Sequence, residues 1–155
     1  DQSDHLLRSS EAYARAAALS RWAANVLEEW VPVLWQLNQP DRALEATQVI
    51  PIERRTRGIV ILRAQCWEQK QAYLDAWYEV AGSFARMPFD AQLYEVARRI
   101  AQLNDPLTLV RWMTPYRNKS AYAAPESLVW EMNGNRELAE SKLSEAQAYT
   151  PPMGN

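Results

Sequence analysis

The sequence predicts an all-α fold built from antiparallel helical hairpins, and three observations indicate it. Glycine is scarce, at 4 residues, and runs of β-branched residues are nearly absent apart from residues 59–61, which favours helix over strand. Apolar residues recur at steps of three and four, which is the spacing of one helix face. The phrase LNQP at 37–40 returns as LNDP at 103–106, and a looser MNGN stands at 132–135. Recurring turn signals of this kind indicate a repeated unit.

The first segment, residues 4–30, is predicted to form one long leading helix. Its apolar residues make a single stripe that begins at Leu6 and ends at Trp30. Pro32 is expected in the first turn of a second helix, because the N–H group that proline lacks is not needed there. That second helix is expected to reach Leu37.

The repeated phrases are predicted to be helix-to-helix turns. Asn38 and Asn104 can end a helix because asparagine tolerates the left-handed conformation, and the proline two residues later can only begin the next helix. Gly134 is expected to do the same in the third phrase. The two asparagines stand 66 positions apart, so a unit of 33 residues places a further turn near Gln71. Connections this short predict antiparallel neighbours.

This 33-residue hairpin unit resembles the tetratricopeptide repeat. Residues 57–88 resemble one unit through Val60, Ala64, Trp67, Ala76, Val80 and Pro88, and residues 120–151 another through Ser127, Trp130, Gly134, Ala139, Leu143, Ala146 and Pro151. Arg63 and Glu126 depart from the repeat pattern. The stretches 24–51 and 90–115 are degenerate units, whose second helices are expected to stop early, at Pro51 and Pro115.

The resemblance implies a right-handed stack of hairpins, a tetratricopeptide-like α-solenoid, with the long N-terminal helix covering its open end. Residues 1–155 would form a single helical-repeat domain with units at about 24–56, 57–89, 90–119 and 120–151.

In such stacks the first helices line an inner face that holds partner segments. The residues that the alignment places there are Trp35, Gln36, Gln65, Glu68, Gln69, Tyr94, Arg98, Gln102 and Glu131, with Asn25 and Glu28 beside them. Because most of them are Glu and Gln, the family's clamp for a chain-terminal carboxylate is not expected.

The residues with catalytic potential do not form a recognisable constellation. His5 is the only histidine, which excludes a histidine triad or a two-histidine metal site within the chain. Four glycines at scattered positions make no phosphate loop. Cys66 lies beside Trp67 on an apolar helix and is interpreted as a buried structural thiol. We therefore predict no catalytic, cofactor or metal site, and a protein that is not an enzyme.

The charges favour a protein partner over nucleic acid. The net charge is −2, which gives no overall attraction to nucleic acid or anionic lipid. The basic cluster at 53–57, with Arg98 and Arg99, leaves two interpretations open: a site for a carboxylate, phosphate or nucleic acid, or a solvated loop paired with neighbouring acids.

The compartment is left open by the sequence. No apolar run approaches the roughly 20 residues of a membrane span. The chain begins with Asp1, so it is either processed or an excised fragment, and a soluble location in the cytoplasm or, after signal removal, the periplasm fits equally.

These expectations combine into a functional hypothesis. The protein is predicted to be a non-catalytic interaction module or scaffold that binds a partner protein or peptide on the inner face of the stack. The alternative is a structural subunit or helical accessory domain of a larger assembly or enzyme, such as one of the cell envelope, with tryptophan-rich faces as permanent interfaces. Homo- and hetero-oligomers are both compatible with this alternative.

Overall fold

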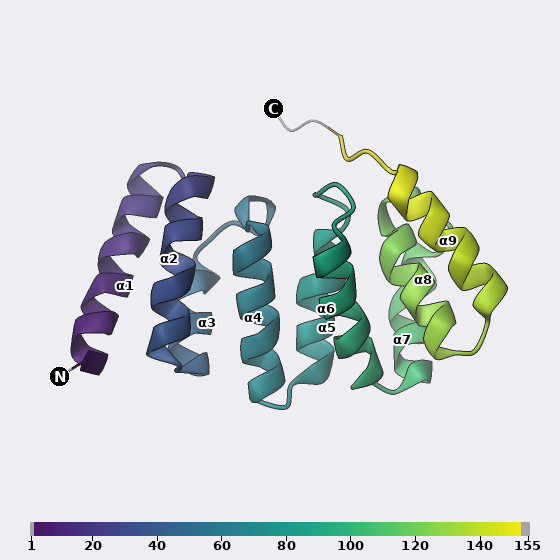
Figure 1. The fold of residues 1–155 in the computed structure, drawn as a ribbon, viewed down its shortest axis with the longest axis horizontal. Helices are drawn as coiled ribbons and strands as arrows, with labels where there is room; N and C mark the ends of the chain where they lie inside the picture. The colour runs from purple at the N-terminus through teal and green to yellow at the C-terminus, as the bar shows by residue number, and fades with distance from the viewer. Residues whose placement is uncertain (1, 153–155) are drawn as a thin grey trace. The chain divides into compact units, whose positions relative to one another are not determined.

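The computed structural model describes residues 2–152, and that part of the chain is helical without strands, which confirms the all-α class. Its α-helices are labelled in Figure 1 and are α1 (Gln2–Leu19), α2 (Ala24–Leu37), α3 (Pro40–Gln48), α4 (Arg57–Gln69), α5 (Tyr73–Ser83), α6 (Ala91–Gln102), α7 (Pro106–Met113), α8 (Ala123–Met132) and α9 (Arg136–Ala148). Three short 3-10 helices join them: η1 (Ile52–Arg54), η2 (Thr114–Tyr116) and η3 (Ser120–Tyr122).

The helices pack into two compact units, which divide the chain between Ala72 and Tyr73. The first unit holds α1 to α4 and the second holds α5 to α9. The predicted single stack through all four hairpins stays a prediction.

In the first unit, α2 and α3 both pack against α4, and α1 packs against α2 and α3. The helices enclose one apolar core, in which Trp30 and Leu27 are fully buried. Burial of side chains of this size stabilises the unit by roughly 1.5–3 kcal/mol each.

The leading helix predicted over residues 4–30 is wrong, because the chain turns back after Leu19. Arg21 and Trp22 take left-handed conformations, with φ of 57° and 62°. Such conformations cost an L-residue roughly 1–2 kcal/mol each. Packing of α1 on α2 offsets that cost, because it joins Ala17 and Trp30 in one core, against which Trp22 also packs.

Pro32 does not begin a helix as expected but lies within α2. A proline there leaves the carbonyl group of Glu28 without its helical donor. Both residues are exposed, so water can supply the missing hydrogen bond. The apolar stripe of Leu27, Trp30 and Leu34 continues past the proline into the core and favours a continuous helix.

In the second unit, α5 packs against α6, and α6 and α7 both pack against α8. The last helix, α9, packs against α8 and η3. Trp77, Leu93, Ile100, Leu109 and Leu128 are fully buried in this unit.

Three of the four predicted turns contain a residue with positive φ. Asn38 has φ of 50°, Gln71 of 61° and Gly134 of 79°. The LNDP turn works differently, because the Asn104 side chain donates hydrogen bonds to the carbonyl groups of Ile100 and Tyr73. Asp105 then accepts from the Thr108 amide and so caps α7, with Pro106 in its first turn.

The first departure from the repeat pattern, Arg63, is a buried side chain with partners at the end of α3. Its Nη1 donates to the Leu44 carbonyl at 2.9 Å and to Thr47 Oγ1 at 2.7 Å, and its Nη2 donates to Gln48 Oε1 at 3.1 Å. A cation is favourable at a helix C-terminus, where carbonyl groups lack intrahelical donors. The guanidinium therefore replaces apolar packing because α3 ends within its reach.

The second departure, Glu126, is only 1% exposed. Its Oε1 accepts from the Asn118 amide at 2.8 Å and its Oε2 from Trp130 Nε1 at 2.9 Å. Lys142 of α9, itself buried, lies 3.8 Å from Glu126 Oε1 and 3.2 Å from Glu145. The carboxylate therefore joins α8 to α9 through a buried ion pair.

Candidate functional site

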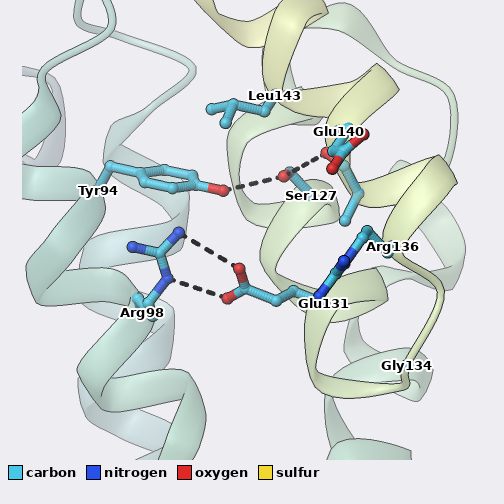
Figure 2. A pocket seen from close by; sticks show the side chains of 9 residues that line it. Tyr94, Arg98, Ser127, Glu131, Gly134, Arg136, Glu140 and Leu143 are labelled. Atoms are coloured by element: carbon cyan, nitrogen blue, oxygen red, sulfur yellow. Dashed lines mark hydrogen bonds and ion pairs between the residues drawn. The ribbon is translucent and has the colours of Figure 1, made fainter.

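A pocket of about 340 Å³ opens between three helices of the second unit, α6, α8 and α9. Figure 2 shows its side chains, and polar and apolar groups line it together. The residues around it are Tyr94, Arg98, Ser127, Glu131, Gly134, Arg136, Ala139, Glu140 and Leu143.

Helical spacing brings these side chains together. Tyr94 and Arg98 stand four residues apart on α6, as Ser127 and Glu131 do on α8, so each pair projects from one helix face. Asp90 fixes the start of α6 by accepting from the Leu93 amide at 2.9 Å.

The α9 wall of the pocket depends on the turn before it. Gly134 supplies the left-handed conformation, and Asn135 caps α9 by accepting from the Leu138 amide at 3.1 Å. Arg136 and Glu140, four residues apart, then face the same side of α9.

A hydrogen-bonded chain links the three helices at the pocket. Tyr94 Oη lies 2.9 Å from Ser127 Oγ (Figure 2). Ser127 Oγ donates to the Ala139 carbonyl at 2.7 Å. Because the single hydroxyl proton of serine is used on that carbonyl, the phenol is the donor to Ser127. Burial raises the pKa of Tyr94 above its ordinary value, so the phenol keeps the proton that this chain requires.

Arg98 is held in place by two carboxylates. Its Nε and Nη2 donate to Glu131 at 3.0 and 3.3 Å, and its Nη1 pairs with Glu95. The guanidinium also lies 5.2 Å from the centre of the Tyr94 ring. The hydrogen bonds that Arg98 donates to Glu131 and then to Glu95 raise its pKa, so this side chain is a fixed positive charge.

Arg136 and Glu140 complete the pocket as exposed charges of opposite sign. The lining then carries two cations, Arg98 and Arg136, and two anions, Glu131 and Glu140. Mixed charge beside an apolar wall suits a peptide segment, whose backbone and side chains offer both signs and apolar surface.

The structure brings three of the predicted inner-face residues into this pocket: Tyr94, Arg98 and Glu131. Gln102 is exposed at the end of α6 and does not line it. The other five belong to the first unit: Trp35 and Gln36 are exposed on α2, and Gln65, Glu68 and Gln69 lie on α4 with partly to fully accessible side chains.

Sequence reasoning missed the part of the pocket that α9 supplies. Arg136 and Glu140 were not among the predicted inner-face residues, and Ser127, Ala139 and Leu143 were noted only for their resemblance to the repeat. The spacing of Arg136, Glu140 and Leu143 on one helix face was a usable signal. The missing information was that α9 lies on the side of α8 that faces α6.

The remaining candidates lie elsewhere. His5 is exposed on α1. Cys66 is buried as expected, and burial raises the pKa of its thiol to about 11, which keeps it protonated at neutral pH. Arg55 of the basic cluster turns inward, and its Nε donates to the Ile50 carbonyl at 3.3 Å. Across residues 2–152, no three His, Cys, Asp or Glu side chains gather in a way that could hold a metal ion.

None of the helices in the described part of the chain is long and apolar enough to cross a bilayer. In comparisons with known proteins, no family model, curated protein or solved structure matches this chain.

Proposed function

We propose that the protein is a non-catalytic interaction module that holds a peptide segment of a partner protein in the pocket between α6, α8 and α9. The observation that carries this proposal is the convergence of Tyr94, Arg98 and Glu131 in one pocket of mixed polarity. The resemblance to the tetratricopeptide repeat independently predicts these three residues as partner-binding candidates.

The fixed geometry of the lining supports a binding role. Arg98 is ordered by Glu131 and Glu95, and Tyr94 is ordered by Ser127, so little side-chain freedom remains to be lost when a partner docks. Arg136 and Glu140 stay accessible at the opening, where they can pair with charges on the partner. Such pairs at a rim set specificity and association rate more than affinity.

The test uses charge-matched variants in affinity capture from the native extract. The double variant Arg136→Ala with Glu140→Ala removes the two charges that α9 supplies to the pocket. The control, Arg42→Ala with Glu45→Ala, removes the same two charge types from the exposed face of α3.

Partners that the native protein and the control retain, and the pocket variant loses, support the proposal. A peptide from such a partner should then bind the native protein about tenfold more tightly than it binds the pocket variant in calorimetry. Identical partners with all three proteins would contradict the proposal.

We also infer that the four hairpins follow a tetratricopeptide-like right-handed stack. Its support lies within each unit: α2 packs on α4 in the first, and α6 packs on α8 in the second, as successive first helices do in such stacks. The position of α9 beside the pocket departs from that arrangement. Small-angle scattering of the whole chain tests the stack, because an extended solenoid and a collapsed globule differ in radius of gyration.

The second candidate function is a structural subunit of a larger assembly. It is favoured by exposed apolar side chains that stand close together in the first unit: Val49 is 63% exposed and Ile52, three residues later, 58%. Exposed apolar surface marks interfaces when it is contiguous. Light scattering that shows an oligomer persisting through dilution would favour this function, whereas a monomer at every concentration favours the peptide-binding module.

A further inference from the structure

The second unit has another concave surface, formed by α5, α7, η2 and η3. It is a groove of about 440 Å³ that shares no residue with the pocket of α6, α8 and α9. Its walls are Tyr78, Gly82, Trp112, Pro115, Tyr116 and Tyr122. We call it the aromatic groove.

The aromatic rings form a fixed wall. Tyr116 and Tyr122 stack with ring centres 4.3 Å apart at 26°. Trp112 contacts both, at 5.1 and 6.5 Å, and the buried Trp77 meets Trp112 edge-on at 5.3 Å and 81°. Because Trp112, Tyr116 and Tyr122 brace one another, this part of the groove can receive a ligand without first being ordered.

Gly82 forms part of the groove, and neither its backbone conformation nor its packing requires glycine at this position. It lies within α5, and its φ is not positive, so its backbone does not require glycine. A Cβ added there would meet no atom within 4 Å, so packing does not require glycine either. Glycine weakens a helix relative to alanine. Glycine also allows another backbone to approach closely, and this advantage would explain its presence at position 82.

The polar groups of the aromatic groove are donors without partners. The hydroxyls of Tyr78, Tyr116 and Tyr122 and the indole N–H of Trp112 make no hydrogen bond to any described residue. No charged or amide side chain lines the groove. The complement of such a surface is an uncharged segment with apolar rings and unbonded carbonyl groups. A proline-rich segment in the polyproline II conformation has both properties. Its proline side chains are apolar rings, and its backbone carbonyl groups make no internal hydrogen bonds.

We propose that the aromatic groove binds a proline-rich, extended segment of a partner protein. Proline rings pack between the aromatic side chains, and the tyrosine and tryptophan donors reach the backbone carbonyls of the segment, as in other aromatic-lined grooves that recognise this conformation. Gly82 leaves room for the segment to approach α5. A carbohydrate is the weaker fit, because its many hydroxyl groups need several strong acceptors, and the lining has tyrosine hydroxyls but no carboxylate or amide side chain.

The test measures fluorescence anisotropy of labelled decaproline on the 155-residue protein, with a glycine–serine peptide of equal length as the reference. Gly82→Ala adds one methyl group to the groove, and Tyr78→Ala removes an exposed ring. Leu103→Ala removes a comparably exposed apolar side chain that lies at the end of α6 and outside the groove, and it serves as the matched control.

We expect decaproline to bind and the glycine–serine peptide not to bind. Gly82→Ala and Tyr78→Ala should each weaken decaproline binding by about tenfold, and Leu103→Ala by less than about twofold. Gly82→Ala should melt no lower than the native protein, because alanine favours helix, so a loss of binding cannot be attributed to unfolding. Affinity should also be nearly independent of salt, because the lining carries no charge.

Two results would overturn the proposal: decaproline does not bind, or its affinity is unaffected by both groove variants. In the first case, a linear glucan that binds in the groove would make a carbohydrate the occupant. Sedimentation provides a further check. A concentration-dependent dimer of the native protein that Gly82→Ala abolishes would make a second copy of the chain the occupant and would also overturn it.

Discussion

Arg63 and Thr47 form a buried hydrogen bond of 2.7 Å between Nη1 and Oγ1, which joins α4 to the last turn of α3. Thr47 Oγ1 itself donates to the Ala43 carbonyl at 2.7 Å, so its proton is used and it is the acceptor for Arg63. The contact explains why a charged residue occupies a position where the repeat pattern expects an apolar one.

Replacing Arg63 with leucine should destabilise the protein, although leucine fits the repeat pattern better. The Leu44 carbonyl would lose its guanidinium donor in a buried place, which costs about 1–3 kcal/mol. Urea unfolding measures the change. Arg42→Leu, on the exposed face of α3, is the control and should alter stability by less than about 0.5 kcal/mol. A stabilised Arg63→Leu variant would show that apolar packing outweighs these hydrogen bonds.

The Glu126–Lys142 pair should show strong energetic coupling. Glu126→Ala leaves a buried ammonium with Glu145 as its remaining carboxylate, and removing one member of a buried pair costs about 3–5 kcal/mol. The double variant with Lys142→Met should lose less than the sum of the two single variants, by about 0.5–3 kcal/mol. A double-mutant cycle in urea measures this coupling. Additive losses would mean that Glu126 acts only through Asn118 and Trp130.

Ser10→Ala should destabilise the hairpin of α1 and α2. Trp30 Nε1 donates to Ser10 Oγ at 2.8 Å, and both residues are buried. Without the hydroxyl, the indole N–H stays buried and unbonded, at a cost of about 1–3 kcal/mol. Thermal unfolding measures the effect, with the exposed Ser3→Ala as control. Equal melting of the two variants would show that water replaces the serine.

Arg98→Ala should weaken partner binding while leaving the stability of the protein nearly unchanged. Its side chain is 30% exposed and that of Glu131 is 39% exposed, so solvent screens the pair, and its loss should change the free energy of unfolding by less than about 1 kcal/mol. Partner capture should fall nonetheless, because Arg98 forms one side of the pocket. Chemical denaturation and capture of the same sample measure both effects. A variant that unfolds readily would make Arg98 a structural residue.

Stability should fall in alkaline solution through Cys66. Burial raises the pKa of the folded thiol to about 11 from an ordinary value of 9.0. Below pH 9 the thiol keeps its proton in both the folded and the unfolded protein, so its burial is not yet opposed by ionisation of the unfolded state. Between pH 9 and about 11 the unfolded state alone ionises, so the free energy of unfolding falls, by up to about 1.4 kcal/mol per pH unit. Urea midpoints across this range should fall less steeply for Cys66→Ala, and equal slopes would assign the loss to other groups.

Much of the helix layout could be predicted, because its signals are local. Apolar spacing gave the helical class, and Asn38 and Gly134 marked left-handed turns. The break at Arg21 and Trp22 carried no such signal, since neither residue favours positive φ. The packing of α1 on α2 determines the backbone conformation at these two residues, and the continuous apolar stripe in the sequence does not indicate a turn there.

For the candidate site, the sequence predicted residues of α6 and α8 and did not predict those of α9. Tyr94, Arg98 and Glu131 followed from their places on first helices, whereas Arg136 and Glu140 depended on the side of α8 on which α9 packs. Two sets of contacts hold α9 on that side of α8: the buried contact of Lys142 with Glu126, and the hydrogen-bonded chain from Tyr94 through Ser127 to Ala139. Both join residues distant in sequence, and spacing along one chain cannot encode such contacts.

The sequence by itself determined the helices and most of their turns, because periodicity and backbone preference act over a few neighbouring residues. Tertiary structure decided the fold-back of α1, the burial of Arg63 and Glu126, and the three-helix pocket. These depend on which surfaces meet, and buried charges are tolerated only where particular partners complete their hydrogen bonds. The two departures from the repeat pattern are therefore positions where long-range contacts overrode a local rule.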